Sequence, residues 1–159
     1  MSAAEPLTIR PATEADCRLL WEWVNEPAVR ASAFHSALIP WEEHEAWFRR
    51  KLADRACFLY IAVDRRGEPV GQVRFDLQPD GRADIDLSIA KAHRQRGCGA
   101  QALRLACERA QEAARPSRWV ARIKPENHAS IRTFEKAGFA WDNGAWTKPC
   151  SVPSSPASA

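Results

Sequence analysis

Apolar and polar residues alternate along several stretches of this chain and recur at helical spacing along others. The alternation predicts strands at residues 7–10, 57–63, 70–77, 83–90 and 118–123. Helical spacing predicts helices at residues 13–24, 41–52, 100–114 and 127–137, with residues 28–40 mostly irregular. A terminal hairpin follows, turning at Asn143-Gly144. The aromatic stripe of Trp41, Trp47 and Phe48 is interpreted as core rather than as a ligand wall.

Turn residues between these stretches indicate how the strands pair. Gly67 and Pro69 lie between the second and third strands, and Pro79-Asp80-Gly81 lies between the third and fourth, which predicts an antiparallel meander. The helix at 100–114 links the strands at 83–90 and 118–123, and such a link makes two strands parallel neighbours. The chain is therefore predicted to be α+β, with a mixed sheet of six to seven strands flanked by about four helices.

The composition predicts one folded domain followed by a short tail. The chain has 159 residues, 45% of them hydrophobic, which suffices for a single core within residues 1–148. Residues 149–159 are almost all Pro, Ser and Ala, so we expect them to be disordered. The sequence shows neither a leader pattern nor an apolar run of membrane-spanning length. We expect a cytoplasmic protein that does not enter a membrane.

Charge and cysteine content disfavour two further classes of function. The net charge of +3 suits a small anionic ligand but is far from the basic footprint of a nucleic-acid-binding protein. The five cysteines are odd in number and, together with the four histidines, show no metal-ligand spacing. We therefore expect reduced thiols, no metal and no nucleic-acid partner.

A basic, glycine-containing loop lies between the strand at 83–90 and the helix that follows it. Gly97 and Gly99 stand at the predicted helix start, where unpaired N–H groups and the helix dipole favour an anion. Arg94 and Arg96 add positive charge. The loop matches neither GxxxxGK[ST] nor GxGxxG. An ordinary basic turn is the alternative interpretation.

Two motifs resemble the GCN5-related N-acetyltransferase (GNAT) superfamily. Arg94-x-x-Gly97-x-Gly99 resembles the [QR]xxGx[GA] loop that binds the acyl-CoA pyrophosphate in that superfamily. A later stretch resembles its closing N-x-x-(S/A)-x-x-x-(Y/F)-x-K-x-G-F signature, with matches at Asn127, Ser130, Phe134, Lys136, Gly138 and Phe139. The order of predicted elements over roughly residues 7–147 is also similar to that of the family.

The resemblance implies direct acetyl transfer from acetyl-CoA to a primary amine in a ternary complex, without an acyl-enzyme. It implies a GNAT fold whose fourth and fifth strands splay apart and admit the pantetheine beside Leu87, Ser88 and Ile89. Asn127 would hold the pantetheine or order the last helix, and Phe134 would stand beside the cofactor. The pyrophosphate is expected at the loop and helix start formed by Arg94, Gln95, Arg96, Gly97, Cys98, Gly99 and Ala100.

The implied reaction requires a base for the amine and an acid for the CoA thiolate. Asp84 and Asp86 project from one strand face, and Asp84, at a position where many family members carry a glutamate, is the first candidate for the base. A solvated carboxylate pair is the alternative. Many members have a tyrosine at the position of Phe134 to protonate the thiolate. Without it, we expect Ser130, Tyr60 or water to donate the proton, or the thiolate to leave unassisted.

The acceptor is inferred from a narrower resemblance. Residues 21–30, 39–48 and 71–75 are similar to the UDP-4-amino-sugar N-acetyltransferases of pseudaminic acid biosynthesis. This implies transfer to the 4-amino group of a UDP-linked 4-amino-4,6-dideoxy sugar. Four polar residues are expected to contact the sugar nucleotide, namely Asn25, Arg30, His44 and Arg74.

Several alternatives stay open at this point. The same fold could serve a ribosomal-protein or aminoglycoside N-acetyltransferase, and the missing tyrosine leaves a non-catalytic acyl-CoA-binding module as a rival. His44 could equally be a surface or capping histidine of its helix. Cys98, beside the expected phosphates, is a candidate for a thiol with a lowered pKa. We expect a monomer or a homodimer.

Overall fold

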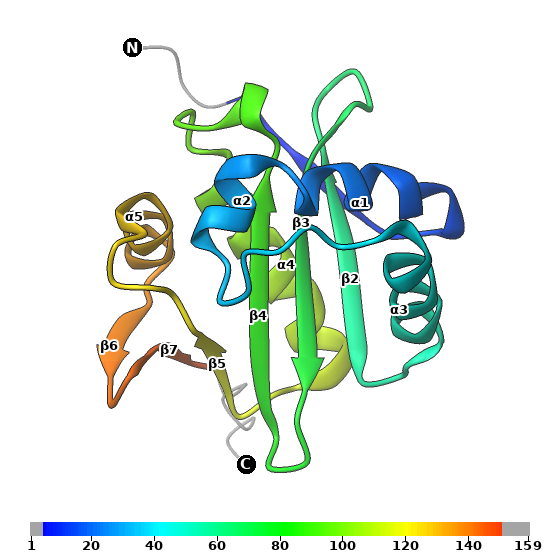
Figure 1. The fold of residues 1–159 in the computed structure, drawn as a ribbon. Helices are drawn as coiled ribbons and strands as arrows, with labels where there is room; N and C mark the ends of the chain where they lie inside the picture. The colour runs from blue at the N-terminus through cyan, green and yellow to red at the C-terminus, as the bar shows by residue number, and fades with distance from the viewer. Residues whose placement is uncertain (1–4, 151–159) are drawn as a thin grey trace, which may run out of the picture.

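A single mixed sheet organises the molecule (Figure 1). Within residues 5–150, which the computed structural model describes, seven strands pair in the order β1-β2-β3-β4-β5-β7-β6. The predicted meander of β2, β3 and β4 is confirmed, as is the parallel pairing of β4 with β5; the other neighbours are antiparallel. The strands are β1 (Thr8–Pro11), β2 (Cys57–Val63), β3 (Pro69–Leu77), β4 (Arg82–Ile89), β5 (Arg118–Ala121), β6 (Ala140–Asp142) and β7 (Ala145–Pro149).

Helices cover both faces of this sheet (Figure 1). The described chain contains α1 (Cys17–Val24), α2 (Pro27–Ser32), α3 (Trp41–Ala53), α4 (Cys98–Ala114) and α5 (His128–Lys136), with short 3-10 turns η1 (Glu14–Asp16) and η2 (Lys91–His93). Helices α4 and α5 pack on one face, while α1, α2 and α3 lie over the other. The strands therefore contribute buried side chains to two hydrophobic layers, one on each face of the sheet.

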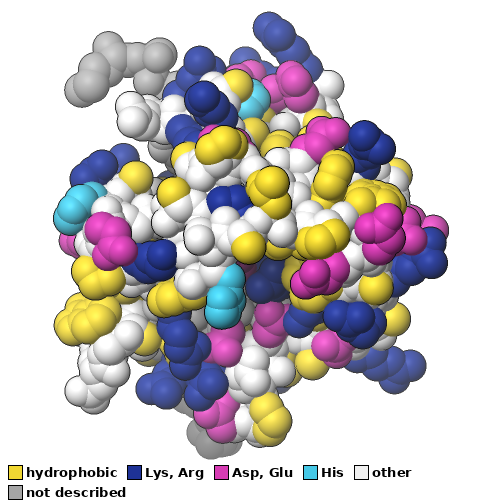
Figure 2. Space-filling model, in the orientation of Figure 1, with side chains coloured by type: hydrophobic (Ala, Val, Ile, Leu, Met, Phe, Trp, Pro, Cys, Tyr) yellow, Lys and Arg dark blue, Asp and Glu magenta, His cyan; other side chains and the backbone are white. Residues whose placement is uncertain are grey.

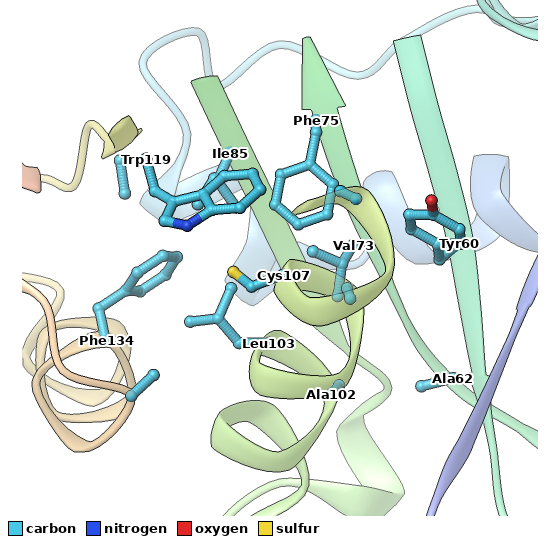
Figure 3. Packing of buried hydrophobic residues seen from close by; sticks show 14 of the residues in the cluster. Tyr60, Ala62, Val73, Phe75, Ile85, Ala102, Leu103, Cys107, Trp119 and Phe134 are labelled. Atoms are coloured by element: carbon cyan, nitrogen blue, oxygen red, sulfur yellow. The ribbon is translucent and has the colours of Figure 1, made fainter. Parts of the chain in front are cut away.

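The larger core lies between the sheet and α4 (Figure 3). Phe75 of β3, which is 1% exposed, has its ring centroid 5.0 Å from that of Trp119 and 6.2 Å from that of Tyr60. Leu103 and Ala106 face these rings from α4 with no exposed surface. On the opposite face, a smaller cluster forms where α1 and α3 meet β2, through Leu20, Phe48, Leu59 and Ile61.

Local sequence signals explain where several elements begin and end. Thr13 and Asp16 form a capping box before α1, in which the Asp16 carboxylate accepts the N–H of Thr13 at 2.8 Å. The Asn127 side chain accepts the N–H of Ser130 at the start of α5. Asn143 and Gly144 both have positive φ, as the predicted hairpin turn requires.

Some predicted boundaries were wrong. Residues 28–40 were expected to be irregular, but α2 occupies Pro27–Ser32, because a proline at the first helical position starts a helix without losing a hydrogen bond. Helix α4 begins at Cys98 rather than at residue 100, and β5 ends at Ala121 rather than at residue 123. Strand β7 extends to Pro149, one residue past the predicted domain end, while residues 151–159 of the predicted tail lie outside the described chain.

The sheet opens between β4 and β5. Their parallel register covers three positions and ends where Asp84 meets Val120, whereas β4 remains paired with β3 as far as Ile89. Residues 85–89 of β4 therefore have a strand neighbour on one side and lack β5 on the other. The two strands diverge in the same way in Figure 1. This is the splay between the fourth and fifth strands that the resemblance to the GNAT superfamily implied.

The packing of the larger core predicts that a buried phenylalanine stabilises the fold much more than an exposed one. Phe75→Ala is expected to lower the free energy of unfolding by about 3–5 kcal/mol, since its ring fills the space between Tyr60 and Trp119. Phe34→Ala, at a ring that is 66% exposed, should change it by less than about 0.5 kcal/mol. Urea denaturation measures both, and a Phe75→Leu variant gives an intermediate loss if the alanine variant does not fold. Equal effects at Phe75 and Phe34 would contradict this packing.

Candidate functional site

A cavity of about 1310 Å³ opens where β4 and β5 separate. It lies between the sheet face under α1–α3, the N-terminal end of α4 and the segment from Arg122 to α5. Eight Lys or Arg residues line it and only three Asp or Glu residues do. Figure 2 shows this face of the molecule, with a hollow near its middle bordered by basic, acidic and hydrophobic side chains. The lining therefore favours a ligand with negative charge.

One end of the cavity is the start of α4. Gly97 caps this 17-residue helix with φ of 78°, a left-handed conformation that glycine adopts without strain. Gly97, Cys98, Gly99 and Ala100 all line the cavity. The first N–H groups of a helix have no intrahelical acceptor and carry the positive end of the helix dipole. This end of the cavity can therefore bind a phosphate through backbone groups.

The two arginines of the loop have different surroundings. Arg94 donates to the backbone oxygen of Ile89 at 2.9 Å and forms a two-armed ion pair with the Glu26 carboxylate. Hydrogen bonds from Arg94 lower the pKa of Glu26, outweighing the opposing effect of burial. Arg96 is exposed and lies outside the cavity lining. Arg94 thus ties the loop to the start of α2, and its guanidinium is already engaged.

Helix α5 supplies the facing wall near the same end. A Cβ at Gly99 would come within 2.8 Å of the Thr133 methyl group, so this glycine is required for the close packing of α4 on α5. Asn127, Ser130 and Thr133 line the cavity. The Cys98 side chain is buried, and burial raises the pKa of its thiol more than the charge of Arg96 lowers it. This direction is opposite to the lowered pKa expected at Cys98, because desolvation exceeds the lowering effects of Arg96 and of the backbone hydrogen bond at Cys98.

The two candidate aspartates of β4 share a face but not a site. Asp86 lines the cavity, and its carboxylate accepts a hydrogen bond from Gln72 Nε2 at 2.9 Å. Asp84 is instead held by Arg82 at 3.2 Å and Arg122 at 3.4 Å, beside the last β4–β5 pair. Asp86 rather than Asp84 therefore lies in the cavity, since the splay begins after Asp84.

Arg74 stands across the sheet from Asp86 at the end of the cavity away from α4. Its Nε donates to Asp76 at 2.9 Å, its guanidinium lies 5.0 Å from the centre of the Trp47 ring, and an Nη lies 3.9 Å from Asp86. Burial lowers the pKa of Arg74, but the charges of Asp86 and Asp76 outweigh it and raise the pKa overall. Asp76 also accepts Lys51 Nζ at 2.7 Å. Arg74 is a fixed cation at this end of the cavity.

Two other residues expected at the acceptor instead support the chain around it. Asn25 bonds both the N–H and the carbonyl oxygen of Ile39, and it lies outside the cavity lining. Arg30 lines the cavity, yet its guanidinium donates to the backbone oxygens of Val24, His35 and Ala37. Both side chains hold the segment between α2 and α3 in place, because its carbonyl groups need donors.

His44 is likewise fixed by the protein itself. It is 4% exposed in α3, its Nε2 lies 3.0 Å from the carbonyl oxygen of Cys17, and its ring stacks on Phe48. Burial lowers the pKa of His44, and the contact with the Cys17 carbonyl opposes this only in part. The residue joins α3 to α1 and also lines the cavity, so neither the surface nor the capping interpretation describes it.

A family model described as an acetyltransferase (GNAT) domain matches residues 6–140. The chain belongs to the GNAT acetyltransferase family. It is accordingly an acyltransferase, as the two motifs implied. No curated protein matches the chain at a significant level.

Solved structures share this fold at low sequence identity. The aminoglycoside acetyltransferase AAC(6')-Ib in complex with coenzyme A and kanamycin is 22% identical with a TM-score of 0.78, over 90% of this chain and 94% of that chain. The same enzyme in complex with paromomycin and acetyl-CoA is 21% identical with a TM-score of 0.79, over 91% of this chain and 94% of that chain. Spermidine N-acetyltransferase from Vibrio cholerae in complex with CoA and spermine is 17% identical with a TM-score of 0.80, over 90% of this chain and 95% of that chain. These similarities confirm the predicted GNAT fold; none of these three structures holds a UDP-linked amino sugar.

Two residues expected beside the reacting groups lie in the core instead. Tyr60 points to the α4 face of β2 and is 6% exposed, whereas its neighbour Leu59 lines the cavity. Phe134 is 2% exposed and points toward Leu103 and Trp119 (Figure 3). The placement of Tyr60 follows from strand alternation, because residues one position apart face opposite sides. Of the two side-chain hydroxyls considered as acids, the cavity has Ser130.

The structure adds cavity residues that the sequence did not single out. Gln72 lies next to Asp86, and Arg50 lines the wall on α3. The interpretation of the aromatic stripe as core holds for Phe48, which is buried, but was wrong for Trp47, which lines the cavity beside Arg50. Polar residues at every second position of β3, namely Gln72, Arg74 and Asp76, were the available signal for a polar face. In the described chain, no group of three His, Cys, Asp or Glu residues could hold a metal ion, and no helix is long and apolar enough to cross a membrane.

The buried histidine predicts a pH-dependent stability. Since burial lowers the pKa of folded His44 below its ordinary value of 6.5, the unfolded chain takes up its proton first as the pH falls. The stabilisation is present above about pH 6.5 and is lost progressively as the pH falls below that value. His44→Gln should show a flatter decline of the free energy of unfolding between pH 7 and 5. The matched variant His128→Gln, at an exposed position, should keep the wild-type slope, and equal slopes in all three proteins would contradict this assignment.

Proposed function

We propose that this protein transfers an acetyl group from acetyl-CoA directly to a primary amine. The observation that carries the proposal is one continuous cavity, which runs from the N-terminus of α4, past the unpaired edge of β4, to Asp86 and Arg74. Its two ends suit the two substrates: backbone N–H groups for a pyrophosphate and a carboxylate for an amine. Solved structures of the same fold with acetyl-CoA or CoA support this arrangement.

The cofactor is proposed to lie along β4. Its pyrophosphate binds the N–H groups of residues 97–100, and its pantetheine extends beside Leu87, Ser88 and Ile89, where β4 lacks β5. Asn127 caps α5 and thereby orders the opposite wall, which supports the second of its two expected roles. Gln95 and Arg94 shape the loop, while Arg96 adds charge from outside the cavity lining.

The chemistry needs few side chains. The amine nitrogen attacks the thioester carbonyl carbon, a backbone N–H of residues 87–89 stabilises the oxyanion, and the C–S bond then breaks. Asp86 takes the proton that the amine loses, directly or through water, since its side chain is 54% exposed. The thiolate receives a proton from Ser130 or water. Neither buried Phe134 nor Tyr60 is part of this proposal.

The acceptor is proposed to carry negative charge. Arg74 is fixed at the acceptor end, Arg50 lines the same wall, and the whole lining has an excess of basic residues. Guanidinium groups bind a diphosphate in a bidentate manner. A UDP-linked 4-amino-4,6-dideoxy sugar meets these requirements, whereas polycationic acceptors would be repelled. Asp86 and Glu43 favour an aminoglycoside or polyamine as the second candidate, and these are the ligands named for the similar structures.

Mass spectrometry of acetylated products tests this proposal. The protein is incubated with acetyl-CoA and, in separate reactions, a UDP-4-amino-4,6-dideoxy sugar, kanamycin, spermidine or a ribosomal N-terminal peptide, with an amine-free control. One acetyl group added to the sugar nucleotide alone supports the proposed acceptor. Acetylation of kanamycin or spermidine would replace it by the second candidate. Acetyl-CoA binding without transfer to any amine would favour a binding module and contradict the proposed reaction.

The two aspartates provide a matched pair of variants. Asp86→Asn should lower kcat by about 100-fold or more, because the amide cannot accept the proton, while acetyl-CoA affinity stays within twofold. Asp84→Asn should leave kcat within about threefold, since Asp84 faces Arg82 and Arg122 rather than the cavity. Steady-state kinetics and calorimetric titration of acetyl-CoA measure these effects. The opposite ranking of the two variants would contradict the assignment of Asp86.

A further inference from the structure

We propose that Gln72 binds the acceptor amine together with Asp86 and makes the enzyme selective for primary over secondary amines. This inference rests on the proposed function and assigns a substrate contact to a residue of β3 that the motifs do not include. Gln72 is 8% exposed, it lines the cavity, and its Nε2 donates to Asp86 Oδ2 at 2.9 Å.

The hydrogen bond to Asp86 determines which way the Gln72 amide faces. A carboxylate can only accept, so the NH₂ group of the amide must point to Asp86 and the oxygen must point away from it. That oxygen, Oε1, is buried and has no hydrogen-bond partner in the described chain. Buried acceptors without partners are rare and destabilising, which suggests that a ligand supplies the donor.

No neighbouring side chain of the described residues donates a hydrogen bond to this oxygen. Arg74, two residues along the same strand face, directs Nε to Asp76 and lies against the Trp47 ring. Across the sheet, Gln72 is in register with Ser88, next to the edge of β4 where the thioester is proposed to lie. Gln72 Oε1 and the Asp86 carboxylate thus belong to one polar face beside the reacting carbonyl.

Two acceptors side by side correspond to the two N–H bonds of a neutral primary amine. In the proposed complex one N–H donates to Asp86, and the Gln72 side chain turns so that its buried Oε1 accepts the other, which leaves the nitrogen lone pair for the carbonyl carbon. A secondary amine has only one N–H, and when this bond is directed at Asp86 the buried Gln72 Oε1 is left without a donor. Sites that lose a hydrogen-bond partner in this way discriminate strongly against the incomplete substrate.

Two variants of Gln72 separate its two contacts. Gln72→Met keeps the size of the side chain and removes both, so kcat/KM for the amine should fall by about 10- to 100-fold with acetyl-CoA affinity within twofold. Gln72→Glu keeps an acceptor oxygen for the amine but places a second carboxyl group beside Asp86, and the proton that the pair shares weakens Asp86 as a base, so kcat should fall more than KM rises. Gln78→Met, outside the cavity lining, is the matched control and should behave as wild type.

The decisive experiment compares the acetylated amine of the panel with its N-methyl derivative. Wild type should prefer the primary amine by about tenfold or more in kcat/KM, and Gln72→Met should reduce this ratio toward one. An unchanged ratio, or an unchanged kcat/KM in Gln72→Met, would overturn the inference while the proposed function stands. A wild-type protein that binds acetyl-CoA but acetylates no amine overturns the proposed function, and the inference with it. If Gln72→Met does not fold, the kcat and KM of Gln72→Glu test the inference instead. Values of both equal to those of the wild type would then overturn the inference.

Discussion

The site depends on the loss of a strand partner along β4. Parallel pairing with β5 ends at Asp84, while antiparallel pairing with β3 continues to Ile89. Backbone groups that have left a sheet must find other partners, and in this fold an extended ligand can take the place of the missing strand. The same divergence decides that Asp86, rather than Asp84, lies in the cavity. The helix termini and side chains around it act on a ligand that this gap admits.

Much of the polar chemistry near the cavity maintains its walls. Asn25 and Arg30 bind backbone groups between α2 and α3, His44 joins α3 to α1, and Arg94 joins the cofactor loop to Glu26. From its side-chain chemistry alone, each of these residues would be predicted to bind a ligand. Unpaired carbonyl groups beside an open cavity need donors as much as a substrate does. Asp86, Arg74 and Gln72 lie together on the sheet side of the cavity, with Asp86 in contact with both of the others.

Both ends of the cavity carry positive electrostatic potential, but its source differs between them. Backbone dipoles at the start of α4 attract an anion, and at the far end Arg74 is held by Asp76 and by the face of Trp47. A basic lining fits a cofactor with several phosphates, and it is the basis of the proposal that the acceptor is also anionic. Two of the similar structures hold spermine or kanamycin, both of which are polycationic amines.

The sequence by itself determined the meander, the parallel β4–β5 neighbours, the capped α5 and the glycine loop, because periodicity and turn chemistry are local signals that the tertiary structure did not override. Pro27 was a local signal for α2 that could have been used. Only the tertiary structure decided which polar residues face the cavity. Tyr60 turns to the core and Asp84 to two arginines because strand phase and the point of divergence are set by the whole sheet. Gln72 donates a hydrogen bond to Asp86 on the neighbouring strand, and the spacing of the two residues along the chain does not predict this contact.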